Sequence, residues 1–379
     1  MAQPLFNWKR FWHPRSSSLN LMDGGYLPDP DSRLGHLANP DVEPFEKICN
    51  AKCLVLLGEP GMGKSTVHHE QQQALERESS SNGDQYLFFN LRSFQSDTRL
   101  AAEVFQSLRF QEWLNGTYNL HLFLDSLDEG LLSINVLVPF LLDEFKKLPT
   151  DRLYLRITSR AAEWPTLLEN GLIEQWGKEV VKFGVLAPLR QKDVAEAASV
   201  SGIMSDSFLK EIEDKSVVPF AIKPVTLKFL LSTYKQHGSF PKSQAELYLT
   251  GCRSLAQENS KSRITAEQTG QLTPNQRLTV AGRIAAITVL ANRNTVFTGT
   301  NSYDASDEDV TIADLSGGSE SSDSTEFAVG EREINETIRS GLFSFSAQGE
   351  NRVGWAHQTY AEYLAAWYVA AHKLQASQI

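Results

Sequence analysis

One short segment of the chain has the glycines, lysine and hydroxyls needed to hold a nucleoside triphosphate. Its residues fit the spacing G-x-x-x-x-G-K-[ST] and are Gly58, Glu59, Pro60, Gly61, Met62, Gly63, Lys64, Ser65 and Thr66. Because glycine lacks a Cβ, successive backbone N–H groups can turn inward around the phosphates. Lys64 adds a positive charge, and the Ser65 hydroxyl can bind Mg²⁺ at the start of a helix whose dipole favours anions. The sequence therefore predicts a nucleoside triphosphate site.

A second segment has three carboxylates directly after an apolar run at 121–124. They are Asp125, Asp128 and Glu129. Ligands collect at the carboxyl ends of parallel strands, so Asp125 could reach a metal ion held by Ser65. Magnesium prefers oxygen ligands, which makes Asp125 its expected protein partner. Asp128 or Glu129 could orient or deprotonate an attacking water, and the sequence leaves that choice open.

The elements that must position these residues alternate between strand-like and helix-like runs. Strands are expected at 53–57, 86–91, 120–125, 153–158 and 180–185. This alternation predicts an α/β fold, with a P-loop NTPase parallel sheet and helices on both faces. If the fourth strand lies between the two motif strands, Arg160 at its end could sense the γ-phosphate. The alternative is a surface arginine at a strand end.

From about residue 189 onward the pattern becomes helical. Pro224 is expected in the first turn of a helix at 225–234, because that turn tolerates proline. A further block from about 271 to the end predicts helices at 278–291, 334–345 and 357–373. The last of these helices has a wide apolar face that must be buried.

Composition and charge limit the remaining possibilities. The 379 residues are 41% hydrophobic, which is enough for two or three domains. No apolar run approaches the roughly 18 residues that span a bilayer, so a cytoplasmic protein with no membrane contact is expected. Eight of the acidic residues lie between 299 and 330, a Ser-rich and Gly-rich segment without Lys or Arg, which predicts a mobile, disordered surface insertion. The charge makes nucleic acid an unexpected partner without excluding it.

The N-terminal residues 1–45 form an extension with a basic and aromatic cluster between Trp8 and Arg15. Such a cluster could contact a partner or nucleic acid. The alternative, which we expect here, is a strap packed on its own domain.

Taken together, these motifs resemble the NACHT group of STAND ATPases, which are regulatory switches of animal inflammasome receptors and bacterial anti-phage defence. The resemblance rests on GEPGMGKST, LFLDSLDE, ITSR, the helix-opening Pro224 and the late segment HQTYAEYLAA, and it covers residue 45 to the C-terminus. It implies a NACHT core at 46–188, a helical domain at 189–270 and a winged-helix domain at 271–379. It also implies ATP or ADP with Mg²⁺ as cofactors.

Carried over by position, the resemblance gives roles to individual residues. Lys64, Ser65 and Thr66 would hold phosphate and metal, and Arg160 would be the first sensor. Pro224 would touch the adenine side of the pocket. His357 would contact the ADP β-phosphate in the closed, resting form.

The function expected from this resemblance is a nucleotide-controlled switch with slow hydrolysis that assembles with itself on activation. It would need a trigger ligand, such as a phage protein, and an effector domain or partner, since the chain shows neither an effector nor sensing repeats. A fragment of a longer protein, or a protein with a separate partner, is therefore expected. The main alternative is an AAA-like ATP-driven remodelling motor or loader, and a third is a nucleotide-stabilised scaffold without useful hydrolysis.

Overall fold

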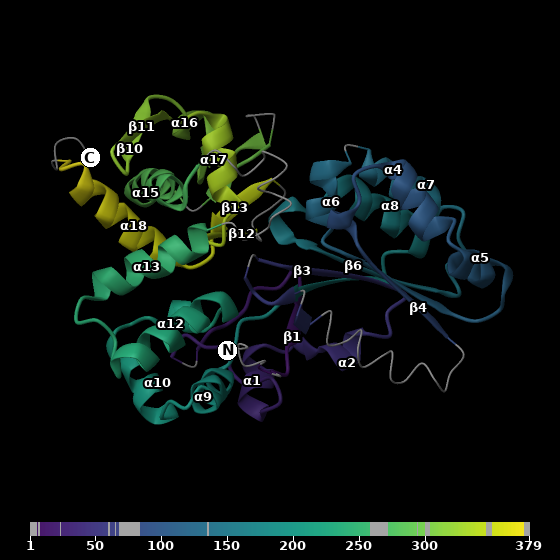
Figure 1. Cartoon of the computed structure of the whole chain (residues 1–379), viewed down its shortest axis with the longest axis horizontal. Coiled ribbons are helices and arrows are strands. Elements are labelled where there is room, and N and C mark those ends of the chain that lie inside the picture. Colours follow the sequence, from purple (N-terminus) through teal and green to yellow (C-terminus); the bar gives the residue numbers. More distant parts are fainter. Residues whose placement is uncertain are drawn as a thin grey trace.

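The computed structural model describes residues 6, 8–22, 24–59, 61–64, 66–67, 84–134, 136–257, 272–293, 295–299, 304–345 and 351–374. Pro60 and Ser65 of the predicted phosphate site lie outside the described residues. Figure 1 shows a sheet with its helices in one half of the molecule, and a mostly helical half beside it. We call this second half, α9 to α18, the C-terminal lobe.

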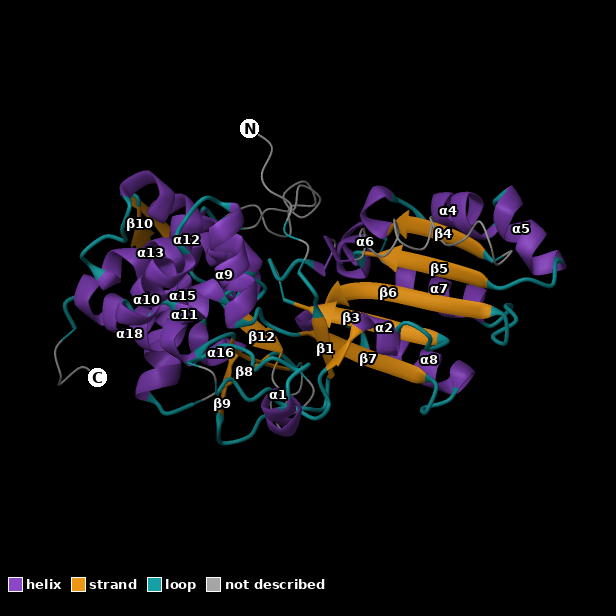
Figure 2. Ribbon diagram, turned by 90° about the horizontal axis from the view of Figure 1, so that it is seen from below, coloured by secondary structure: helices purple, strands orange, loops and turns teal. Residues whose placement is uncertain are grey.

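A mostly parallel sheet forms the first half. Its order is β2-β1-β7-β3-β6-β5-β4, in which β3 to β7 are parallel. At one edge β1 pairs antiparallel with β7, and β2 pairs antiparallel with β1. All five expected strands are present, and β6 lies between the two motif strands β3 and β5. Figure 2 shows the arrowheads of β4, β5 and β6 pointing toward the C-terminal lobe. The strands are β1 (Phe11–Pro14), β2 (Glu43–Pro44), β3 (Cys53–Gly58), β4 (Gln85–Asn90), β5 (Leu120–Asp125), β6 (Leu153–Arg160) and β7 (Val181–Leu186).

Helices cover both faces of this sheet, as predicted. Side chains alternate along β3, so Val55 and Leu57 enter one hydrophobic cluster while Leu54 and Leu56 enter another. The second cluster includes residues of α2 (Phe45–Ile48). Figure 1 shows α2 on the face opposite to α7 and α8. The helices of the first cluster are α4 (Asp97–Leu100), α5 (Leu108–Asn115), α6 (Leu127–Ser133), α7 (Leu137–Phe145) and α8 (Thr166–Trp176).

The N-terminal segment packs on the protein itself, as expected of a strap, partly on this half and partly on the C-terminal lobe. Strand β1 pairs with β7, and Phe11 and Trp12 are each only 2% exposed. Helix α1 (Arg33–Ala38) follows on the surface. Within the described ranges, no helix is long and apolar enough to cross a lipid bilayer.

The first part of the C-terminal lobe is helical. Pro224 is the first residue of α12, which confirms its predicted place in an opening turn, and Gly238 ends that helix with a φ of 71°. The helices are α9 (Gln191–Val200), α10 (Ser205–Asp214), α11 (Val218–Ala221), α12 (Pro224–His237) and α13 (Gln244–Ala256).

A winged-helix domain completes the lobe. Its strands form a sheet in the order β12-β13-β8-β9, beside three helices that precede and separate them, and α18 closes the domain against α15. One hydrophobic cluster runs through both parts of the lobe; in it Phe220 stacks on Tyr360 at 5.0 Å between ring centroids. The elements are α15 (Pro274–Leu290), β8 (Thr295–Phe297), β9 (Asp309–Thr311), α16 (Ile312–Leu315), β10 (Ser319–Ser322), β11 (Thr325–Ala328), α17 (Glu331–Ile338), β12 (Phe343–Phe345), β13 (Arg352–Trp355) and α18 (Gln358–Ala371).

Two expectations for this domain are wrong. The acidic segment is folded wherever the structure describes it, because distant groups pair with its carboxylates: Asp309 with Arg352 at 2.9 Å, and Glu320 with the Tyr368 hydroxyl at 2.6 Å. The helix expected at 334–345 ends at Ile338, and the chain continues as β12. The carboxylates find partners elsewhere in the chain, whereas β12 pairs with β13, the next strand.

Candidate nucleotide-binding site

The phosphate loop follows β3 and turns on two glycines. Gly61 has a φ of 77° and Gly63 a φ of 90°, both in the left-handed region that favours glycine. A Cβ on Gly61 would also come within 2.4 Å of Val225 Cγ1. The N–H groups of Thr66 and Val67 both donate to the Gly63 carbonyl at 3.1 Å, which starts a helical turn there. These features form the P-loop predicted from the sequence.

Lys64 lies within this loop and points back over it. Its ammonium donates to the carbonyls of Gly58 and Glu59, the latter at 3.1 Å. Burial lowers the pKa of Lys64 to about 8; Asp128 opposes this shift and Arg160 adds to it. A phosphate in the loop would take over these hydrogen bonds and stabilise the charged amine.

Asp125, at the end of β5, is held by neighbouring strands. Its carboxylate accepts hydrogen bonds from the hydroxyls of Thr158 and Ser126 and from the Asn90 amide. Ser126 has a φ of 60°, so the chain turns sharply and α6 begins at the next residue. That turn places Asp128 and Glu129 in the first turn of α6. The sequence analysis missed Asn90 and Thr158, whose signal is a polar residue near the carboxyl end of a strand.

The residues around Asp125 suit magnesium, which needs few protein ligands, better than a metal ion whose ligands all come from the protein. The hydroxyls of Thr158 and Ser126 and the Asn90 amide are neutral groups that orient this carboxylate. In the part of the chain that the structure describes, no three His, Cys, Asp or Glu residues gather to hold a metal ion. Mg²⁺ usually keeps several waters and takes its other oxygens from phosphates, so one carboxylate suffices.

Arg160 forms an ion pair and a backbone hydrogen bond with Asp128. Its Nε lies 3.1 Å from Asp128 Oδ2, and its backbone N–H donates to Oδ1 at 3.1 Å. The arginine side chain is 11% exposed, which excludes the alternative of a surface arginine. Glu129, in contrast, has a buried Oε2 with no hydrogen-bond partner among the described residues. The arrangement therefore favours Glu129 over Asp128 as the group that contacts water.

A cavity of about 340 Å³ brings most of the predicted residues together between the sheet and the C-terminal lobe. Pro224 lies in its wall, and the Val225 N–H donates to the Gly61 carbonyl at 3.3 Å. The lining residues are Glu59, Gly61, Gly63, Lys64, Thr66, Ser126, Asp128, Glu129, Thr158, Arg160, Pro224, Val225 and Lys228.

His357 is not among the lining residues that the structure describes. It caps the N-terminus of α18, where its Nδ1 accepts from the Thr359 N–H at 3.2 Å. Burial, and then the charge of Lys223, lower the pKa of His357 to about 4. Lys223 itself pairs with Glu59 of the phosphate loop at 2.8 Å. The β-phosphate role of His357 stays a prediction.

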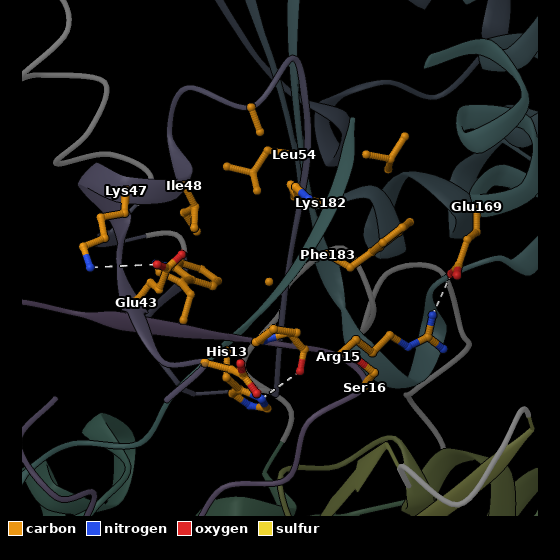
Figure 3. A pocket seen from close by; sticks show the side chains of 16 residues that line it. His13, Arg15, Ser16, Glu43, Lys47, Ile48, Leu54, Glu169, Lys182 and Phe183 are labelled. Carbon is orange, nitrogen blue, oxygen red and sulfur yellow. Dashed lines mark hydrogen bonds and ion pairs between the residues drawn. The ribbon is translucent and has the colours of Figure 1, made fainter. Parts of the chain in front are cut away.

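A larger cavity, of about 780 Å³, lies at the β1 and β7 edge of the sheet (Figure 3). Two of its cations are already paired, Arg15 with Glu169 at 2.7 Å and Lys47 with Glu43 at 3.9 Å. None of the described residues that line it belongs to the phosphate loop or to the second motif. We therefore place the nucleotide in the smaller cavity.

No family model matches the sequence, and no curated protein has a similar sequence. Solved structures that resemble this chain include the Walker-type ATPase PABY2304 of Pyrococcus abyssi, at 12% identity and a TM-score of 0.42 over 92% of this chain and 99% of that chain. The Aeropyrum pernix ORC2 protein, in ADPNP and ADP complexes, matches at 11% identity and a TM-score of 0.37, over 85% of this chain and 89% of that chain. A Thermotoga maritima RuvB variant matches at 12% identity and a TM-score of 0.39, over 82% of this chain and 86% of that chain. A likeness at this level gives no substrate or partner, so the site geometry remains the evidence for function.

Proposed function

We propose that this protein is a nucleotide-controlled switch that binds ATP or ADP with Mg²⁺, hydrolyses ATP slowly and assembles with copies of itself when activated. The resemblance of its motifs to the NACHT group supports a role in innate immune or anti-phage defence, with a separate trigger ligand and effector. One observation carries the proposal: two cations at the nucleotide site also bond to the winged-helix domain.

Both cations donate to the short segment between α17 and β12. Arg160 Nη1 donates to the Arg339 carbonyl at 3.3 Å, and Lys223 Nζ donates to the Gly341 carbonyl at 3.3 Å. Each also pairs with a carboxylate of the site, Arg160 with Asp128 and Lys223 with Glu59. The charge state of the site and the position of the C-terminal lobe are therefore linked through the same side chains.

These contacts supply most of the free energy that a switch needs. A hydrogen bond to a charged group contributes about 1.5–3 kcal/mol, and the partly exposed Lys223–Glu59 pair takes the lower end, so this pair and the Arg160–Arg339 contact together supply on the order of 3–4.5 kcal/mol. Reversing a 1:99 equilibrium needs roughly 5.5 kcal/mol of differential binding. A γ-phosphate that attracts Arg160 away from the Arg339 carbonyl would favour the open form, because it weakens only the closed one.

In hydrolysis, each residue has a defined task. Lys64 and Thr66 hold the phosphates, and Glu129 orients the water and accepts its proton. Asp125, with Ser65, would hold the magnesium ion, which when bound neutralises charge on the phosphate oxygens. Arg160 responds to the γ-phosphate, Pro224 bounds the adenine side, and His357 would approach the ADP β-phosphate in the closed form.

The main alternative is an AAA-like ATP-driven remodelling motor or loader, and one feature of the winged helix weighs against DNA as its substrate. Helix α17 begins with Glu331 and Glu333 in the first turn, and like charges repel DNA phosphates. The carbonyl of Arg339, which caps the C-terminal end of α17, is already bonded to Arg160. A remodelling motor acting on protein keeps the same core chemistry, so turnover kinetics must separate it from a switch.

The test is the molecular mass in solution, by light scattering, with ADP and with ATP and Mg²⁺. Because the trigger is unidentified, a His357→Ala variant serves to open the closed form. We expect the unmodified protein to be an ADP-bound monomer and the variant to assemble with ATP; adding Lys64→Ala should abolish that assembly. Rapid, sustained ATP turnover with a mass independent of nucleotide would instead support the motor.

A further inference from the structure

We infer that Arg10, in the N-terminal segment, is a positioning residue of the phosphate loop: it holds the Met62 carbonyl outward and so aims the Gly63 N–H into the phosphate site. The inference rests on the nucleotide binding proposed above. It adds to that site a residue 52 positions away from the loop, in a part of the chain outside the recognised motifs.

The contacts of Arg10 are short and buried. Its Nη1 donates to the Met62 carbonyl at 2.9 Å, and its Nη2 donates to the Ala187 carbonyl at 2.8 Å. The residue as a whole is only 8% exposed. A guanidinium stays charged in proteins and offers a planar fork of donors, so it can hold two carbonyls in a fixed relation.

The backbone on both sides of Arg10 is anchored, which fixes the guanidinium in place. The Ala187 N–H donates to the Phe11 carbonyl at 2.9 Å, and Arg190 lies over the Phe11 ring at 4.7 Å from its centroid. On the other side, the Trp8 indole donates to the Asp193 carbonyl at 3.1 Å. The segment therefore cannot turn Arg10 away from the loop without losing contacts at both ends.

Peptide geometry turns this contact into control of the phosphate site. The Met62 C=O and the Gly63 N–H belong to one planar, trans peptide unit, so they point in opposite directions. Holding the carbonyl toward Arg10, outside the loop, aims the N–H to the inside, where phosphate oxygens need donors. A Cβ on Gly63 would lie 3.3 Å from Arg10 Nη1, so the glycine also leaves room for the guanidinium.

The test compares Arg10→Lys and Arg10→Ala with a matched control, Arg152→Lys. Arg152 also donates to backbone carbonyls, those of Trp113 at 3.2 Å and Tyr118 at 3.3 Å, but far from the phosphate loop. Affinities for ADP and for adenosine are measured by competition against a fluorescent ADP. Thermal unfolding without nucleotide reports folding. Arg10→Lys keeps a charge and one donor position, so it remains informative if Arg10→Ala does not fold.

We expect Arg10→Lys to weaken ADP binding on the order of tenfold, Arg10→Ala to weaken it more, and neither to change adenosine binding by more than about twofold. If Arg10 had only a structural role, its replacement would weaken the binding of ADP and of adenosine together. Equal ADP affinity in folded Arg10→Lys, or an equal loss in Arg152→Lys, would overturn the inference. Absence of ADP binding by the unmodified protein would instead overturn the proposed nucleotide site itself.

Discussion

Replacing Lys223 with methionine should loosen the closed form of the protein. Lys223 precedes α12 in the C-terminal lobe, is 4% exposed, and pairs with Glu59 of the phosphate loop at 2.8 Å. Its second bond, to the Gly341 carbonyl, lies within the lobe and orients the ammonium. Methionine keeps an unbranched stem of similar length and removes the charge, so the lobe retains its packing but loses its bond to the loop.

The magnitude follows from the burial of the pair. A bond between charged groups contributes about 1.5–3 kcal/mol. The Glu59 side chain is 21% exposed and would be rehydrated once freed, so we take the lower end, about 1.5 kcal/mol. That value shifts the ratio of open to closed forms roughly tenfold. If opening limits ADP release, the release rate rises by the same factor.

The assay is the displacement of a fluorescent ADP by excess unlabelled ADP, followed by stopped flow. The histidine NMR signals give a second readout: the pKa of His357, lowered to about 4 by burial and by Lys223, should rise in the variant. Lys215→Met is the control, because Lys215 donates to the Lys242 carbonyl at 3.0 Å within the helical domain alone. An unchanged ADP release rate in folded Lys223→Met would refute this reasoning.

Four further predictions concern the core chemistry and the winged helix. Glu129→Gln should lower the ATP hydrolysis rate by about 10²–10⁴-fold with little change in ADP affinity, measured by phosphate release; an undiminished rate would favour a scaffold. Asp125→Asn should raise the magnesium concentration needed for ATP binding in a titration, and an unchanged midpoint would exclude Asp125 from the metal shell. Burial lowers the pKa of Lys64 to about 8, so the affinity for ADP should be constant below that pH and fall above it, where binding takes up a proton. Calorimetry at pH 9 in two buffers should then give different binding enthalpies, and equal enthalpies would contradict this prediction. Arg277→Met should lower the unfolding free energy by about 3–5 kcal/mol, because Arg277 pairs at 2.6 Å with Glu336, whose side chain is 2% exposed. Adding Glu336→Leu should restore most of the thermal unfolding midpoint. An Arg277→Met variant as stable as the unmodified protein would contradict this prediction.

The sequence was sufficient for the parts of the site that are local. The phosphate loop and the Asp125 segment are contiguous, so their spacing predicts their geometry. The sequence predicts a role for Arg160 only if β6 lies between β3 and β5, and the sheet order satisfies that condition. The local sequence also predicts the place of Pro224, because proline has a fixed φ and no N–H and is therefore favoured in the first turn of a helix.

Contacts between distant residues could not be predicted in the same way. Lys223 and Glu59 are 164 positions apart, and neither pairing nor orientation follows from composition. In the sequence, Arg10 stands out only as part of a basic and aromatic cluster. The acidic segment at 299–330 looked unpartnered because its cations, Arg352 and Arg283, lie outside it. Counting charges within one segment of the sequence cannot reveal the cations that folding brings to it from other segments.

The hydrophobic cluster shared by the helical and winged-helix domains also has an evolutionary consequence. Phe220 and Tyr360 stack within it, and the Tyr360 hydroxyl donates to the Pro219 carbonyl, so the seam between the two domains is a packed core. A chimera that exchanges the winged helix alone would cut through this core and leave apolar surface uncovered. Recombination that keeps α9 to α18 together preserves it. The structural unit after the phosphate-binding sheet is therefore the whole C-terminal lobe, and a change in the core of either domain alters the packing of the other.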